Sequence, residues 1–274
     1  MRKILIYTFV VLFTLVVGAA TLVWTSIVRI QLPHGAVLHV LPAMKTGQSP
    51  GAVILCPGGG FSYLETWKEG YMWFPFFYTR GYAVALLEYR LPDGDSQTPL
   101  TDGSEAVAVM RKRAAEWGFD DRPVGIVGFS AGGYLASALM VSDSDAVRPD
   151  FGVLFYPVVS MKKELTHPGT HDRLLGKDAP DSLEAAYSSE LHVSPKTPPA
   201  YIAVSSDDVK VNPRNALLFR DAMLAEKRPV RLRVYPSGGH GWGLRILFGY
   251  RGEVGDDLAA WLADGPDTDK TYNR

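Results

Sequence analysis

An apolar segment that turns at once into an alanine-rich segment constrains the fold of this chain more than any other feature. Residues 124–129 read Val-Gly-Ile-Val-Gly-Phe, and a Gly-x-Ser-x-Gly motif spans residues 128–132. A strand that turns directly into a helix needs small neighbours at the turn, which explains Gly132 and Gly133. The turn places Ser130 at the N-terminus of a helix, where a developing negative charge is favoured. The pattern predicts that Ser130 is a nucleophile, and an incidental serine in a glycine-rich turn is the alternative.

From residue 35 onward, short apolar runs alternate with amphipathic segments. Strands are expected at residues 36–41, 52–56, 82–88, 124–129, 151–156, 200–205 and 230–235. Helices are expected at residues 69–78, 101–117, 131–140, 213–225 and 255–262. Fully apolar strands between helices predict an α/β fold with a mostly parallel central sheet and helices on both faces. The polar residues 159–199 interrupt the alternation and predict a small cap insertion over the top of the sheet.

The first residues of the chain are unusually apolar. Arg2 and Lys3 are followed by no charged residue until Arg29. A signal peptide would use residues 4–17 as its apolar region and the small residues 18–20 as its cleavage site. A transmembrane signal anchor would use the whole stretch, because about 20 apolar residues span a bilayer.

The two alternatives differ in what remains attached to the protein. The apolar run continues beyond the small residues, and Trp24 suits the aromatic belt of a membrane interface, which favours the anchor. A buried N-terminal helix is a third alternative. Both export alternatives place the remainder outside the cytoplasm. Residues 1–30 are therefore expected to carry export or membrane attachment, and residues 31–274 to form one domain.

Charge and cysteine content exclude several classes of protein. The chain has 28 Lys and Arg against 29 Asp and Glu, so the basic excess that nucleic-acid binding needs is absent. The single cysteine, Cys56, excludes an internal disulfide framework and a cysteine-based zinc cluster. His167 and His171 have the spacing of a metal pair, but Pro168 and Gly169 are expected to break the helix between them. No metal site is predicted.

A histidine and two aspartates supply the partners for the serine. His240 lies in Gly-Gly-His-Gly-Trp at residues 238–242, just after the last apolar strand. Asp207 and Asp208 follow the strand expected at residues 200–205. A carboxylate there can accept a hydrogen bond from the histidine Nδ1–H and fix its tautomer. Asp208 is favoured for this role, with Asp207 as the alternative that braces the turn.

A run of three glycines follows another strand. Residues 56–61 read Cys-Pro-Gly-Gly-Gly-Phe. Backbone N–H groups of Gly59 and Gly60, together with that of Ala131, are predicted to form an oxyanion hole. A phosphate-binding loop is the alternative, but no Gly-Lys-Ser/Thr follows.

Taken together, these residues resemble the α/β-hydrolase superfamily. The chain order Ser130, Asp208, His240 is the order of that superfamily. More narrowly, the chain resembles the acetyl-xylan esterase or BD-FAE-like branch of carbohydrate esterases. The matching segments lie between residues 38 and 262, at residues 57–63, 69–70, 81–84, 88–92, 128–133, 174–176, 206–208 and 238–241. Two positions depart from the pattern, since Pro57 stands where histidine is common and Tyr134 where the branch often has histidine.

The resemblance implies a serine esterase that hydrolyses short-chain acyl esters, above all acetyl esters, on a small-molecule or carbohydrate substrate. In this chemistry His240 takes the proton of Ser130, an acyl-enzyme forms, and no cofactor is needed. Four aromatic residues near the motifs could stack on a sugar ring or simply anchor their loops: Phe61, Tyr63, Trp67 and Trp242.

Other functions fit the same motifs. A lipase or general carboxylesterase acting on membrane-proximal esters would suit an anchored chain. A peptidase and a non-catalytic hydrolase-fold module are further alternatives, although the complete set of three catalytic residue types argues against the module.

Overall fold

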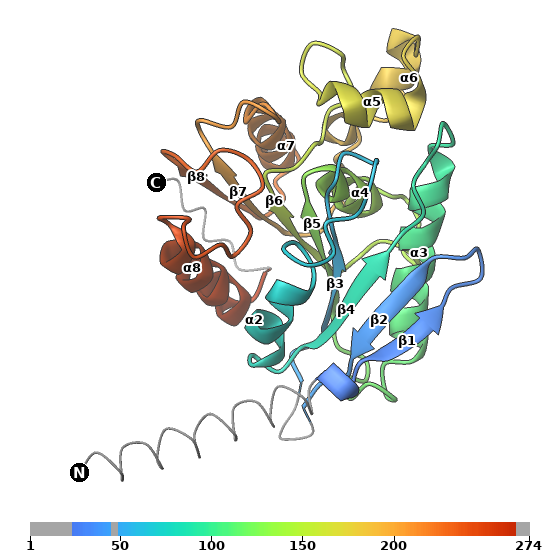
Figure 1. Ribbon diagram of the computed structural model, residues 1–274, viewed down its shortest axis with the longest axis vertical. Helices are drawn as coiled ribbons and strands as arrows, with labels where there is room; N and C mark the ends of the chain where they lie inside the picture. Colours follow the sequence, from blue (N-terminus) through green and yellow to red (C-terminus); the bar gives the residue numbers. More distant parts are fainter. Residues whose placement is uncertain (1–23, 45–48, 267–274) are drawn as a thin grey trace, which may run out of the picture.

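An open, twisted sheet runs through the protein (Figure 1). The computed structural model describes residues 24–44 and 49–266. In chain order the strands are β1 Val28–Gln31, β2 Val37–Leu41, β3 Ala52–Cys56, β4 Ala83–Glu88, β5 Val124–Phe129, β6 Phe151–Phe155, β7 Ala200–Ser205 and β8 Val230–Tyr235. Their order across the sheet is β1-β2-β4-β3-β5-β6-β7-β8.

Strand direction follows from how the strands are connected. The pairs β1–β2 and β2–β4 are antiparallel. From β4 to β8 every neighbouring pair is parallel, as expected where helical crossovers join the strands. All five residues of β3 are buried, with Ile54 in one apolar cluster and Val53 and Leu55 in another. Both faces of the sheet are therefore covered, and the predicted α/β fold is confirmed.

Helices lie on both faces of this sheet (Figure 1). The helices α3, α4 and α7 contribute to the apolar cluster on one face, and η1, α2 and α8 to the cluster on the other. In chain order the helical segments are η1 Tyr71–Trp73, α2 Phe74–Tyr78, α3 Gln97–Lys112, α4 Ala131–Met140, α5 Pro168–Leu175, α6 Asp181–Ala186, η2 Ser189–Leu191, α7 Arg214–Ala225 and α8 Arg251–Asp264.

Several expected boundaries moved. The helix expected at residues 69–78 begins only at Tyr71 and starts as a 3₁₀ turn. The helix α3 begins at Gln97 because Pro99 falls in its first turn, where an N–H group has no intrahelical acceptor. These shifts leave the layers of the fold unchanged.

The N-terminal prediction can be followed only in part. Residues 1–23, which hold most of the expected signal peptide or anchor, lie outside the described residues. Within residues 24–44 and 49–266, no helix is long and apolar enough to cross a membrane. Trp24, assigned to a membrane interface by the anchor alternative, stacks on Trp67 with ring centroids 6.0 Å apart.

The predicted domain boundary after residue 30 falls inside β1, where Val28 pairs with Val40 and Gln31 with Val37. Backbone hydrogen bonding to β2 therefore includes residues that the apolar pattern assigned to the export segment. An apolar run alone does not show where one such segment ends and an edge strand begins.

Residues 159–199, the predicted insertion, carry α5, α6 and η2. Figure 1 shows α5 and α6 beyond the carboxyl ends of the parallel strands. The start of the segment is tied to α7, because Asn215 Oδ1 accepts hydrogen bonds from the N–H groups of Val159 and Ser160, both at 3.0 Å. This attachment places the segment above the sheet edge where the candidate site lies.

Candidate active site

The predicted site residues meet at the carboxyl edge of the parallel strands. Ser130 directly follows β5, Asp208 follows β7 and His240 follows β8. The triple-glycine loop follows β3, which neighbours β5. Crevices outside the carboxyl ends of parallel strands are where open α/β sheets bind ligands.

The backbone at Ser130 is held in a sparsely populated conformation. Its φ is 52° and its ψ is −118°, and its N–H group donates to Phe155 O at 3.1 Å. Gly132 is required by close approach, since a Cβ there would lie 2.0 Å from the carbonyl oxygen of Cys56. Such strain persists only where the surroundings enforce it, and it aims the serine hydroxyl out of the sheet.

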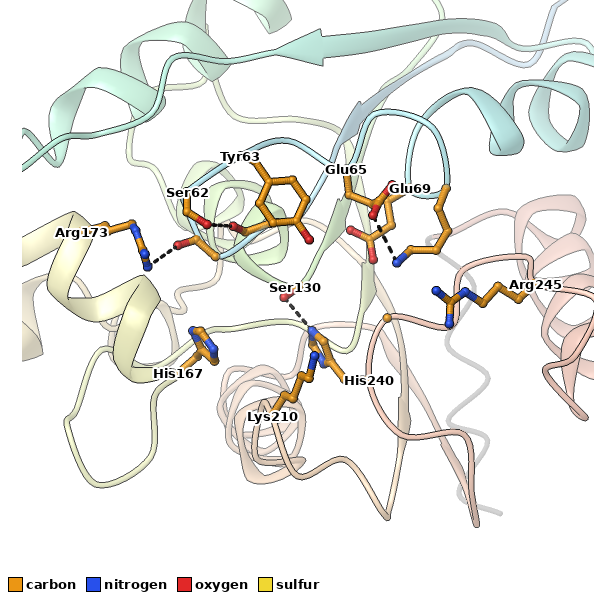
Figure 2. Close-up of a pocket in the computed structure, with 14 residues that line it drawn as sticks. Ser62, Tyr63, Glu65, Glu69, Ser130, His167, Arg173, Lys210, His240 and Arg245 are labelled. Atoms are coloured by element: carbon orange, nitrogen blue, oxygen red, sulfur yellow. Dashed lines mark hydrogen bonds and ion pairs between the residues drawn. The ribbon is translucent and has the colours of Figure 1, made fainter.

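A chain of hydrogen bonds joins the three predicted residues (Figure 2 shows its Ser130–His240 step). Ser130 Oγ lies 2.8 Å from His240 Nε2, and His240 Nδ1 lies 2.7 Å from Asp208 Oδ2. The other oxygen of Asp208 accepts the N–H groups of Lys210 and Val211 at 2.9 and 3.0 Å. With Nδ1–H donating to the carboxylate, Nε2 is left to accept the serine proton.

Asp207 takes a different position. Its carboxylate accepts the N–H group of Gly239 at 2.8 Å and that of Gly238 at 3.2 Å. It contacts the loop that carries His240 through the backbone, whereas Asp208 contacts the imidazole itself. Of the two aspartates, Asp208 is the one placed to orient the histidine.

Three backbone N–H groups beside Ser130 lack an acceptor. Among the residues that the structure describes, those of Gly59, Gly60 and Ala131 donate no hydrogen bond. Gly59 has a φ of 126°, and a Cβ there would lie 2.1 Å from Tyr63 O, so only glycine fits. Gly59 and Gly60 line the same cavity as Ser130. These groups are free to donate to an oxygen that carries negative charge.

Comparison with known proteins agrees with this geometry. A protein family with the description alpha/beta hydrolase fold matches residues 78–244 of the 274-residue chain. The chain belongs to this hydrolase family. An acetylxylan esterase of Xylanibacter ruminicola is 36% identical over 230 residues, covering 82% of this chain and 47% of the relative. Endo-1,4-beta-xylanase B of Butyrivibrio fibrisolvens is 32% identical over 204 residues, covering 69% and 32%.

The chain therefore spans about half of the length of the first relative and about a third of the second. Solved structures match it over more of their length. An acetyl ester-xyloside bifunctional hydrolase from Caldicellulosiruptor lactoaceticus has a TM-score of 0.76 and 31% identity, covering 83% of this chain and 88% of its own. A carboxylesterase from Lactobacillus plantarum has a TM-score of 0.73 at 21% identity, covering 87% and 97%, and shows the shared fold.

Sequence reasoning gave no role to Glu69, which links two of the site's loops. Its side chain is buried, and it accepts the N–H group of Gly58 at 2.9 Å and the hydroxyl of Tyr156 at 3.0 Å. The Tyr156 oxygen accepts in turn the N–H group of Gly243 at 3.2 Å, three residues after His240. Burial raises the pKa of Glu69, opposed by the charge of Lys68 and by these hydrogen bonds. The only available signal was that Glu69 lies within a segment matching the resemblance.

A polar cavity of about 430 Å³ opens over Ser130 and His240 (Figure 2). Its lining holds four cationic side chains and two carboxylates, and none of its lining residues is aliphatic. Besides Ser130 and His240, the lining residues are Gly59, Gly60, Ser62, Tyr63, Glu65, Lys68, Glu69, His167, Arg173, Lys210, Gly241 and Arg245.

The four aromatic residues predicted near the substrate separate into two groups. Tyr63 is exposed and lines the cavity, and Trp67 is exposed but lies outside the lining. Phe61 is 2% exposed and packs edge-on against a buried tyrosine, with ring centroids 6.0 Å apart. Trp242 is also 2% exposed and stacks on Phe248 at 4.4 Å. Phe61 and Trp242 therefore anchor their loops, because their rings are buried against other core residues and are not accessible to a substrate.

The histidines of the insertion also differ from expectation. The helix α5 begins at Pro168, and its N-cap is His167, whose Nδ1 accepts the N–H group of Thr170 at 3.1 Å. Proline and glycine therefore start this helix, since proline suits a first turn. His171 is buried, with Nε2 3.0 Å from Glu184 Oε1. Burial lowers the pKa of His167, aided by the charges of His240 and two nearby cations.

Proposed function

We propose that this protein is a serine esterase that hydrolyses short-chain acyl esters, above all acetyl esters, on carbohydrates. The observation that carries the proposal is the hydrogen-bonded series Ser130, His240 and Asp208, with contacts of 2.8 and 2.7 Å. The relatives named for acetyl ester and xylan chemistry support the same class of substrate. The chemistry requires no cofactor.

The first half of the reaction forms an acyl-enzyme. His240 Nε2 accepts the hydroxyl proton as Ser130 Oγ attacks the ester carbonyl carbon. Asp208 stabilises the imidazolium without taking the proton. The carbonyl oxygen becomes an oxyanion, which accepts hydrogen bonds from the N–H groups of Gly59, Gly60 and Ala131. His240 then protonates the alcohol oxygen as the carbon–oxygen bond breaks.

The second half repeats these steps with water. His240 removes a proton from a water molecule, which attacks the acyl carbon and forms a second tetrahedral intermediate at the same N–H groups. Collapse of that intermediate returns the proton to Ser130 Oγ and releases the carboxylic acid.

The cavity supports a short acyl chain. A long acyl chain gains binding energy by burying methylene groups, at about 0.8 kcal/mol for each. The lining residues offer glycine, hydroxyl and charged side chains, with Tyr63 as the one aromatic residue among them. An acetyl group on a polar, hydroxyl-rich alcohol fits this lining better than a lipid ester does.

We also propose that the enzyme works outside the cytoplasm. Arg2 and Lys3, followed by no charge until Arg29, support export or anchoring by the N-terminal segment. The pairing of Val28 with Val40 supports a hydrolase domain that begins slightly before residue 31.

One experiment tests the proposed function. Hydrolysis of p-nitrophenyl acetate, butyrate and octanoate, and acetate release from acetylated xylan, are measured for the wild type and Ser130→Ala. We expect acetate to be the preferred acyl group and acetate to be released from xylan, with both activities lost in Ser130→Ala. Preference for octanoate would support a lipase instead. Activity on no ester, or activity that survives Ser130→Ala, would refute the proposal.

A further inference from the structure

We infer that the cavity selects esters whose alcohol part carries a carboxylate, as in an acetylated sugar acid. This inference rests on the proposed esterase function and narrows its substrate class. Hydrolysis of a neutral acetyl ester requires no cation beside the serine, yet several cationic side chains surround this one.

The cavity concentrates positive charge in a chain that has almost none in excess. Its lining contains Lys68, Arg173, Lys210 and Arg245, whereas the formal net charge of the whole chain is −1. Overall composition therefore does not explain the local excess.

The two carboxylates of the lining are already engaged. Glu65 Oε2 lies 3.5 Å from Lys68 Nζ, and this ion pair offsets the charge of Lys68. Glu69 is buried and accepts the hydrogen bonds of Gly58 and Tyr156. Neither carboxylate forms an ion pair with the other three cations of the lining.

The remaining cations differ in what they contact. Arg173 donates to the carbonyl oxygens of Gly169 at 2.9 Å and Gly60 at 3.4 Å, which orients it along the glycine loop. The side chains of Lys210 and Arg245 are exposed and have no carboxylate partner within residues 24–44 and 49–266. These two side chains can bind an incoming anion without first breaking an ion pair, and the planar guanidinium matches the two oxygens of a carboxylate.

Lys210, Arg245 and Arg173 lie where the leaving alcohol of the ester would bind. His240 protonates the alcohol oxygen, so the alcohol lies on the histidine side of Ser130. Lys210 and His240 line the same cavity, and Figure 2 shows Arg245 and Arg173 on opposite sides of Ser130. The backbone N–H group of Lys210 donates to Asp208, so the loop that carries this cation is fixed to the catalytic residues.

The test uses three acetylated substrates that differ only at C6, the carbon attached to the sugar ring. They are the acetylated forms of methyl glucoside, methyl glucuronoside and methyl glucoside 6-phosphate. For the wild type we expect kcat/KM for the glucuronoside to exceed that for the glucoside about ten-fold at low salt, and the ratio to fall as salt screens the charges.

Charge-neutral variants locate the effect. Lys210→Gln and Arg245→Gln are each expected to lower the glucuronoside-to-glucoside ratio about three-fold, and the double variant to bring it near one. Lys112→Gln, an exposed lysine at the end of α3, makes the same change in charge away from the cavity and should leave the ratio unchanged. Unacetylated methyl glucuronoside should inhibit the wild type more strongly than methyl glucoside, which measures binding independently of turnover.

The possible outcomes distinguish failure of this inference from failure of the proposed esterase function. Equal kcat/KM for glucoside and glucuronoside would overturn the inference while leaving the esterase intact. A preference for the 6-phosphate alone would also overturn it, by assigning the cations to a phosphate. An unchanged ratio in the double variant would do the same. Hydrolysis of no ester, p-nitrophenyl acetate included, would refute the esterase and this inference with it.

Discussion

Replacing Glu69 should damage catalysis even though this residue does not touch the serine. Its carboxylate joins the glycine loop, through Gly58, to the loop that carries His240, through Tyr156 and Gly243. Removing the carboxylate should therefore displace the predicted oxyanion donors and the histidine relative to each other. Glu69 acts as a positioning residue, and its loss should lower kcat more than it raises KM.

The size of the effect follows from its contacts. Each hydrogen bond to a charged acceptor contributes about 1.5–3 kcal/mol. Glu69→Ala leaves the N–H of Gly58 and the hydroxyl of Tyr156 without their acceptor and adds a cavity, so we expect a loss of about 3–5 kcal/mol in the free energy of unfolding. Glu69→Gln keeps an oxygen for Gly58 but turns an amide N–H toward Tyr156, and should cost about 1 kcal/mol.

The catalytic effect is bounded by the oxyanion hole. Losing one donor of such a hole costs about 10²- to 10³-fold in kcat. Because Gly58 adjoins the two predicted donors rather than supplying one, we expect kcat to fall about ten-fold in Glu69→Gln and about a hundred-fold in Glu69→Ala. KM should change little, because the donors are aimed at the transition state.

Steady-state kinetics with p-nitrophenyl acetate, together with urea denaturation, measure both quantities. Tyr156→Phe removes the other member of the link, and a double-mutant cycle with Glu69→Gln should show strong non-additivity in kcat. Wild-type kcat in a folded Glu69→Ala protein would refute the positioning role. A rise in KM at constant kcat would also refute it, by assigning Glu69 to substrate binding.

Three further predictions follow from other contacts. Asp208→Asn should lower kcat about 10³- to 10⁴-fold because the amide disturbs the histidine tautomer, whereas Asp207→Asn should cost less than about ten-fold; kinetics showing the reverse order would contradict the assignment. Burial raises the pKa of Glu69 above its ordinary 4.5, so the folded protein holds this proton more tightly than the unfolded chain does. The stability that this difference contributes is fully present below pH 4.5 and is lost as pH rises through the raised pKa. The Tm of Glu69→Gln should therefore rise relative to the Tm of the wild type between pH 4.5 and neutral pH in thermal denaturation, and a constant difference in Tm would argue against it. Asp102 is fully buried and accepts two side-chain N–H groups and the backbone N–H group of Arg90, so Asp102→Ala should lower the free energy of unfolding by about 3 kcal/mol in urea denaturation. A loss below about 1 kcal/mol would show that hydration of Arg90 replaces the pair.

Much of the fold could be predicted because its signals are local. The strand Val124–Phe129 and the helix Ala131–Met140 lie where the apolar run and the small residues after it required them. Apolar strands between helices are specific to covered parallel sheets, and parallel strands bring their carboxyl ends to one edge. This is why Ser130 and His240 could be placed at the same edge without any knowledge of distances.

Edges and ends of elements could not be predicted in the same way. The strand Val28–Gln31 is held by its pairing with β2, and it overlaps the apolar run only at Val28, before Arg29 ends that run. Nothing in that run marks the point where backbone pairing begins.

The sequence by itself determined the layered fold, the turn at Ser130 and the chain order of the predicted catalytic residues, because each depends on neighbours along the chain. Only the tertiary structure decided between Asp207 and Asp208, buried Phe61 and Trp242 in the core, and joined Glu69 to two loops. It also brought together cations from four separate segments around one serine. These features arise from contacts between residues far apart in sequence. Such contacts form only when the folded sheet brings the loops that follow its parallel strands together at one edge.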